Sequence, residues 1–60
     1  MTLYRFYLCN ADGHFLRVQE VECADSEIKV TALRMVKDAP DYVVAVEVWE
    51  KEKRLARVER

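Results

Sequence analysis

The sequence predicts an α+β domain with a ββαββ layout, in which four antiparallel strands in the order 2-1-3-4 carry one helix on one face. Three observations support this prediction. Two strand-like segments flank a turn at residues 10–14, a stretch with helical periodicity follows, and a valine-rich segment precedes a final strand-like segment. With 60 residues, the chain has room for a single domain that spans residues 1–60.

The first hairpin is indicated by the turn Asn10-Ala11-Asp12-Gly13-His14. Asn at the first position and Gly at the fourth are typical of a type I turn followed by a left-handed glycine. The turn then sets four facing pairs: Asn10–His14, Leu8–Leu16, Phe6–Val18 and Tyr4–Glu20. These even-numbered positions are mostly apolar, so they are expected to form the core face. Val21 and Cys23 break the alternation, and a bulge near residues 19–20 is expected to return them to the core.

A helix is expected after residue 25. Asp25 is a good N-cap residue, and Pro40 disfavours helical geometry at Ala39. The apolar side chains between them recur at helical spacing and predict one buried stripe: Ile28, Ala32, Met35 and Val36, with Leu33 at its margin.

A second hairpin is expected from residues 42–49 and 55–59, because four valines in the first segment favour a strand. The predicted cross-strand pairs are Glu50–Arg54, Trp49–Leu55, Val48–Ala56, Glu47–Arg57 and Val46–Val58. This register places Lys53 where glycine is normally preferred in the turn. The whole predicted core is Tyr4, Phe6, Leu8, Leu16, Val18, Ile28, Ala32, Met35, Val44, Val46, Val48 and Val58.

The sheet face that the helix does not cover is the predicted functional surface. Its predicted interface residues are Arg5, Tyr7, Phe15, Arg17, Val43, Trp49, Leu55 and Arg57. A contiguous apolar surface usually marks an interaction site, and Tyr, Trp and Arg are enriched at interface hot spots. A domain of this length buries only about 60% of its unfolded surface, so a partner subunit would add stability. We therefore expect a protein-interaction module that forms a homodimer or binds another protein.

Two other interpretations of this face stay open. Exposed aromatic rings beside arginines resemble a platform on which single-stranded nucleic acid stacks. The net charge of −1 and the position of Glu47 within the face speak against nucleic acid. The face is alternatively an ordinary solvated surface with scattered aromatic side chains.

Catalysis, metals and membranes are not expected. Cys9 and His14 project to opposite faces in the predicted register, so they do not form a nucleophile and base. Cys9, His14 and Cys23 lack the paired spacing of a metal site, and no motif for a cofactor is present. We read no signal peptide and no apolar run long enough to cross a bilayer, which predicts a cytoplasmic protein with free thiols.

Five short stretches together resemble a group of small bacterial proteins to which no activity has been assigned. The stretches are Tyr4-Arg5-Phe6-Tyr7, Asp12-Gly13-His14, Cys23-Ala24-Asp25, Val46-Glu47-Val48-Trp49 and Leu55-Ala56-Arg57. They span nearly the whole chain. Lys51-Glu52-Lys53 departs from the glycine-containing turn expected in such relatives. The resemblance implies the ββαββ layout and carries over no functional residue.

Overall fold

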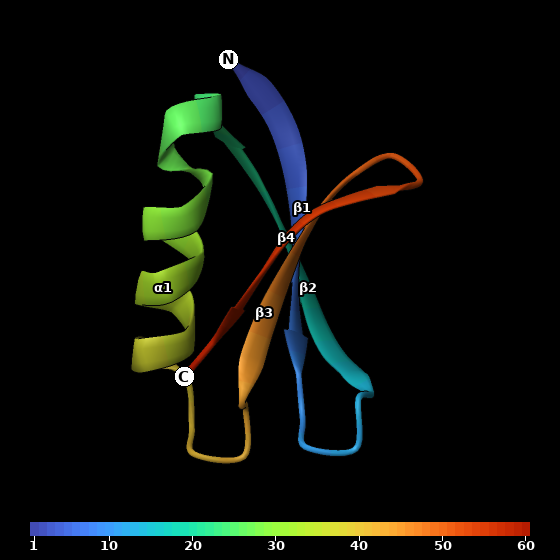
Figure 1. Ribbon diagram of the computed structural model, residues 1–60, viewed down its shortest axis with the longest axis vertical. Coiled ribbons are helices and arrows are strands. Elements are labelled where there is room, and N and C mark those ends of the chain that lie inside the picture. The colour runs from blue at the N-terminus through green and yellow to red at the C-terminus, as the bar shows by residue number, and fades with distance from the viewer.

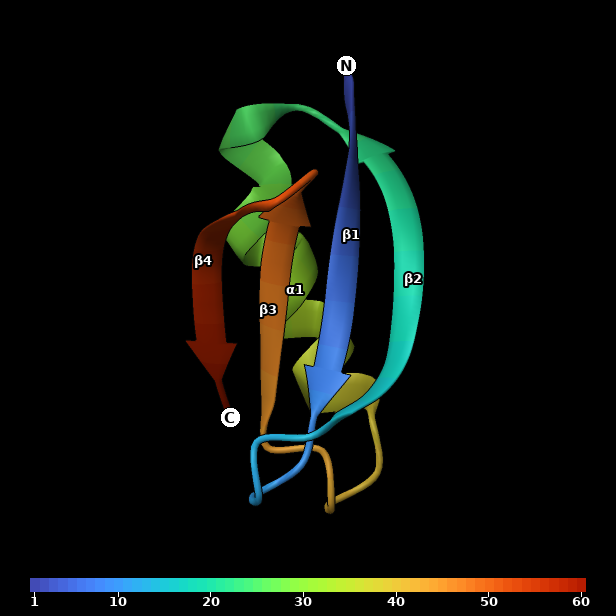
Figure 2. The same cartoon turned by 90° about the vertical axis from the view of Figure 1, so that its right-hand side faces the viewer.

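The computed structural model describes residues 1–60 and confirms the predicted fold (Figure 1). Its elements are β1 (Thr2–Cys9), β2 (Phe15–Cys23), the 3-10 turn η1 (Asp25–Glu27), α1 (Ile28–Asp38), β3 (Ala45–Glu50) and β4 (Lys53–Glu59). The strands form one antiparallel sheet in the order β2-β1-β3-β4. The helix lies on one side of the sheet, behind the strands in Figure 2. No helix has the length and hydropathy that a bilayer span requires.

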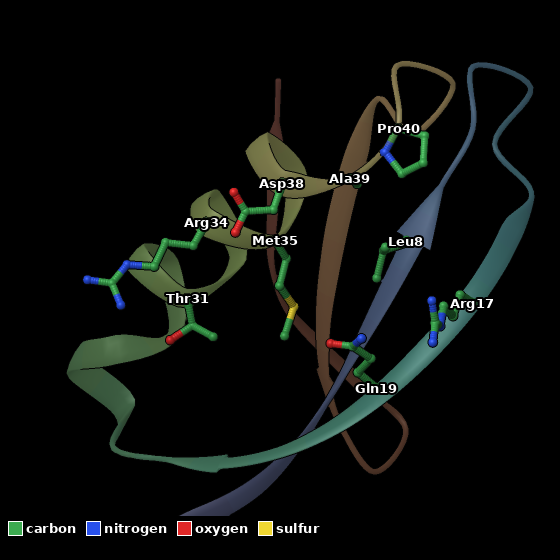
Figure 3. A pocket seen from close by; sticks show the side chains of 9 residues that line it. All are labelled: Leu8, Arg17, Gln19, Thr31, Arg34, Met35, Asp38, Ala39 and Pro40. Atoms are coloured by element: carbon green, nitrogen blue, oxygen red, sulfur yellow. The ribbon is translucent and has the colours of Figure 1, made fainter.

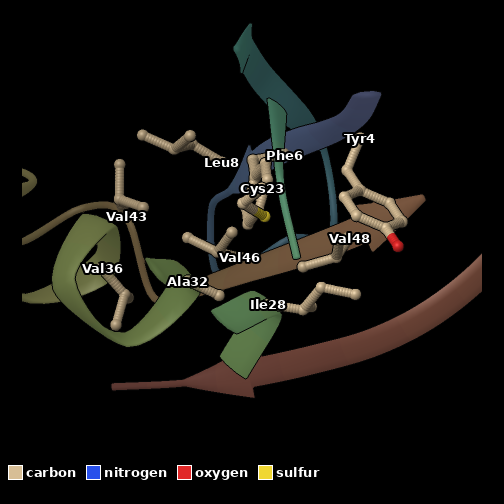
Figure 4. Close-up of a cluster of buried hydrophobic side chains, with 10 residues drawn as sticks. All are labelled: Tyr4, Phe6, Leu8, Cys23, Ile28, Ala32, Val36, Val43, Val46 and Val48. Carbon is tan, nitrogen blue, oxygen red and sulfur yellow. The ribbon is translucent and has the colours of Figure 1, made fainter. Parts of the chain in front are cut away.

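The core lies between α1 and the sheet (Figure 4). Its ten buried residues are Tyr4, Phe6, Leu8, Cys23, Ile28, Ala32, Val36, Val43, Val46 and Val48. The even-numbered face of β1 and the helical stripe are therefore confirmed, with Met35 and Val58 partly buried at the margin. Val43 takes the buried place that was predicted for Val44, which is only half-buried.

The turn of the first hairpin forms as predicted. Asn10 and His14 face each other through a 3.0 Å bond from the Asn10 amide, and Gly13 has a φ of +84°. The Asn10 side-chain oxygen also accepts hydrogen bonds from the backbone amides of Asp12 and His14. The asparagine thus closes the turn with both its backbone and its side chain.

The register beyond this turn differs from the prediction. Cys9 pairs with Phe15 and Leu8 pairs with Arg17, so the bulge lies at Leu16 rather than near residues 19–20. Leu16 and Val18, which were predicted to be buried, are 46% and 49% exposed. The physical reason is the bulge, which reverses the parity of β2, so that Val18 faces Tyr7 on the side opposite α1 and Arg17 takes the helix side. The helix itself packs over β3 and β4. The helix side of β2 near the first turn is therefore uncovered and carries polar residues.

The second hairpin is tighter than predicted. Glu50 pairs with Lys53 across a two-residue turn, and Lys51, not Lys53, has a positive φ of 54°. The predicted pairs Glu50–Arg54 and Trp49–Leu55 are wrong, because Arg54 faces Trp49 and Leu55 has no partner in β3. Leu55 is therefore a bulge residue in β4, and the predicted register is restored beyond it. The pairs Val48–Ala56, Glu47–Arg57 and Val46–Val58 are confirmed.

The helix begins later than predicted. Asp25 is not its N-cap but the first residue of η1, and α1 starts at Ile28. The Asp25 carboxylate instead accepts a hydrogen bond from the hydroxyl of Tyr4 in the core. The Glu27 carboxylate accepts the amide N–H of Ala24 at 3.1 Å. These two bonds tie the start of the helical segment to β1 and to the end of β2.

Candidate protein interface

Three aromatic side chains form a row on the side of the sheet opposite α1. We call this side the open face; it is turned toward the viewer in Figure 2. Tyr7 lies in the middle of the row, with its ring stacked on Phe15 at a centroid distance of 4.5 Å. Tyr7 also makes an edge contact with Trp49 at 6.4 Å. The row crosses from β2 through β1 to β3, and offset or edge-on geometry of this kind stabilises aromatic pairs.

A buried carboxylate lies beside the aromatic row. Glu47 faces Tyr7 in β1 and Arg57 in β4, and only 7% of the residue is exposed. The Trp49 indole donates a 3.1 Å hydrogen bond to Glu47 Oε1. Arg57 donates a 2.7 Å bond to Glu47 Oε2, and Arg54 lies 3.6 Å from the same oxygen. Both carboxylate oxygens of Glu47 therefore have partners within the chain.

This network keeps Glu47 ionised. Burial by itself raises the pKa of a carboxyl group, because the charged form loses its hydration. The hydrogen bonds from Trp49 and Arg57 and the nearby guanidinium charges act in the opposite direction and prevail. The pKa of Glu47 consequently lies below its ordinary value. The hydrogen bond to Glu47 likewise raises the pKa of Arg57, so this pair stays charged.

The open face holds five of the eight predicted interface residues: Arg5, Tyr7, Phe15, Trp49 and Arg57. The placement of Arg17 is wrong, because the bulge at Leu16 turns it to the helix side opposite Leu8. Val43 is also wrong, since it is buried in the core. Leu55 is the unpaired residue of the β4 bulge and is 37% exposed.

Sequence reasoning missed Val18 and Arg54 on the open face, and Glu20, which was predicted to face Tyr4, faces Arg5 there instead. Val18 faces Tyr7 and extends the apolar surface along β2, and Arg54 takes the place opposite Trp49. Both omissions follow from the two bulges, which shift the parity of one strand against its neighbour. No signal in the residues themselves marks Leu16 or Leu55 as the extra residue.

The two cysteines and the histidine differ in their exposure. Cys9 and Cys23 are free and buried, whereas His14 is exposed in the first turn. Burial, reinforced by the charge of Glu47, raises the pKa of the Cys9 thiol, and burial also raises that of Cys23. Both thiols are therefore neutral near pH 7, in which state a cysteine is a poor nucleophile.

Comparison with known proteins adds no relative. No protein-family model matches the chain, and no curated protein or solved structure is significantly similar to it. The resemblance to small bacterial proteins therefore stays a prediction. The functional argument rests on the geometry of the open face.

Proposed function

We propose that this chain is a small protein-interaction module that self-associates through its open face. One observation carries the proposal: an ordered aromatic row lies on a sheet face that no other element of the chain covers. Phe15 remains 50% exposed although its ring is stacked on Tyr7. Rigid aromatic side chains of this kind contribute large contact area at low cost in conformational entropy. Burial of this row would also add apolar contacts to a small core.

The charges of the open face favour a second copy of the chain as the partner. Arg5 lies 3.8 Å from Glu20, and the Glu47 carboxylate already holds Arg54 and Arg57. In a two-fold interface each patch meets its own copy, so unpaired like charges would confront each other. Charges that are paired within one chain reduce this repulsion. A strongly charged partner of another kind would have to displace these internal pairs.

The dimensions of the chain set the expected strength. The Cα atoms extend over 30 × 21 × 15 Å, so the total buried area falls toward the low end of specific interfaces, near 1,200 Å². Interfaces of this size belong to weak or transient complexes. We expect a dissociation constant in the micromolar range and a cytoplasmic dimer, a location that free thiols favour.

The single-stranded nucleic acid alternative receives less support from the same geometry. The aromatic row would offer stacking surfaces, but the arginines beside it are engaged by carboxylates. A phosphate backbone would compete with Glu20 for Arg5 and with Glu47 for Arg54 and Arg57. Affinity for nucleic acids depends mainly on free cationic groups. We therefore favour a protein partner.

Sedimentation equilibrium from micromolar to millimolar concentration tests the proposal. Wild type should dimerise, and Phe15→Glu should remain monomeric because two carboxylates would meet in the interface. Val30→Glu is the matched control, since Val30 is similarly exposed at 48% but lies on α1. A wild type that stays monomeric at about 1 mM, or a Val30→Glu variant that dissociates equally, would contradict the proposal.

A further inference from the structure

A groove lies on the other side of the sheet, between α1 and β2. The helix α1 packs over β3 and β4, and no second helix covers the same side of β2. Figure 3 shows Met35 and Leu8 lining the space between the helix and the strand, with Arg17 and Gln19 on β2. The groove measures about 380 Å³ and is open to solvent. A smaller hollow of about 180 Å³ shares Leu8, Arg17 and Pro40 with it.

Arg17 is the cation common to both hollows. Arg5, Arg54, Arg57 and Arg60 all lie within ion-pair distance of a carboxylate, whereas Arg17 and Arg34 have no such partner. Both line the larger groove, whose one carboxylate is that of Asp38, so the groove carries a net positive charge. Its surroundings in the smaller hollow are apolar and include Leu16 and Tyr42, which are 46% and 65% exposed. An unpaired guanidinium beside exposed apolar side chains complements a carboxylate that carries an apolar neighbour.

The strand that carries Arg17 also has a free edge. β2 is nine residues long and is the last strand on its side of the sheet, so its outer backbone groups have no strand partner. The other edge strand, β4, carries four charged residues among its seven: Lys53, Arg54, Arg57 and Glu59. β2 carries only three in nine: Arg17, Glu20 and Glu22. Charged side chains protect sheet edges against pairing, so β2 is the less protected edge.

We propose that the edge of β2 and the adjoining groove bind an extended, acidic peptide of a partner protein. The peptide adds to β2 as a fifth strand. Main-chain hydrogen bonds supply affinity in this mode, and alternate side chains supply specificity. A carboxylate pairs with Arg17, and an apolar side chain two residues away enters the hollow beside Leu16 and Tyr42. The spacing follows from strand geometry, because residues i and i+2 point to the same face about 7 Å apart.

Selection from a displayed library of random nonapeptides tests this proposal. Selected sequences should share an acidic residue with an apolar residue two positions away. A synthetic selected peptide should bind wild type, and Arg17→Glu should weaken it at least about tenfold. Lys37→Glu makes the same change of charge on the exposed surface of α1 and should leave affinity unchanged. In an added strand, every second peptide N–H points to β2. N-methylation of the odd-numbered or of the even-numbered peptide residues should therefore abolish binding in one of the two peptides and not in the other.

Three results would overturn the proposal: no enrichment of peptides, enriched peptides without the acidic–apolar spacing, or equal binding by Arg17→Glu. A thermal melt of each variant shows that it is folded before affinity is compared. The groove and the open face lie on opposite sides of the sheet, so Tyr7→Ala, which removes the centre of the aromatic row from β1, should retain peptide binding. The two proposals can therefore fail separately.

Discussion

Arg57 donates a 2.7 Å hydrogen bond to Glu47 across the β3–β4 pair, and this contact binds the last strand to a buried charge. The side chain of Arg57 is one-third exposed, whereas that of Glu47 is only 9% exposed. The carboxylate therefore depends on the chain for the solvation that water supplies elsewhere. Its neighbours determine how the stability of the domain responds to pH and to substitution.

Glu47 should make the domain sensitive to acid. Because the pKa of Glu47 is lower in the folded state, its contribution is complete above the ordinary value of 4.5. That contribution is lost as the pH falls through the lower pKa of the folded protein. Glu47→Gln should cost about 1–3 kcal/mol at pH 7 and flatten the loss of stability in this acid range. Urea unfolding measured from pH 2 to pH 7 would show an unchanged acid limb if this account is wrong.

Trp49→Phe should isolate the indole hydrogen bond. The substitution keeps an aromatic ring near Tyr7 but removes the donor that lies 3.1 Å from Glu47 Oε1. A buried acceptor that loses its partner destabilises a protein by about 1–3 kcal/mol. The pKa of Glu47 should also rise toward its ordinary value, so acid unfolding should begin at a higher pH. A midpoint of acid unfolding equal to that of wild type would contradict this role of Trp49.

Phe6 and Val18 together test the observed register. Phe6 is fully buried, and Phe6→Ala should cost about 3–5 kcal/mol. Val18 is half-exposed on the open face, so Val18→Ala should change stability by no more than about 0.5 kcal/mol. The register expected from the turn would instead place both residues in the core. If Phe6→Ala does not fold, Phe6→Leu should still unfold reversibly in urea with a smaller loss, because it removes fewer buried atoms.

Lys51→Gly should stabilise the second hairpin. Lys51 has a φ of 54°, a left-handed conformation that costs a residue with a Cβ about 1–2 kcal/mol. Glycine adopts this conformation freely, so thermal unfolding should shift upward. Glu52→Gly is the matched control, because Glu52 does not have a positive φ. Glu52→Gly should lower the free energy of unfolding by about 0.5–1 kcal/mol, because glycine gives the unfolded chain greater freedom. An equal gain in stability in Lys51→Gly and Glu52→Gly would refute the explanation.

The candidate interface was only partly predictable from the sequence, because two bulges shift the parity of the strands. Alternation identified Tyr7, Phe15 and Trp49 as residues of the open face. Phe15 lies between the first turn and the bulge at Leu16, and Trp49 lies on β3, whose pairing with β1 contains no bulge. Arg17 and Val43 were misplaced, since one follows a bulge and the other precedes β3 in the connection from α1. The pairing of Glu47 with Arg57 was predicted as a cross-strand pair. The bond from Trp49 was not, because it joins side chains two apart on one strand face.

Local sequence determined the elements of this protein. Asn10 and Gly13 fix the first turn through their own backbone preferences, and the spacing of Ile28, Ala32 and Val36 fixes the buried face of α1. Only the tertiary structure decided where the extra residues Leu16 and Leu55 are accommodated. A bulge reverses the parity of the residues beyond it, and the one at Leu16 turns Val21 and Cys23 toward the core beneath α1. Because α1 covers β3 and β4, the start of β2 carries polar residues on its helix side, and Arg17 faces a groove instead of the open face.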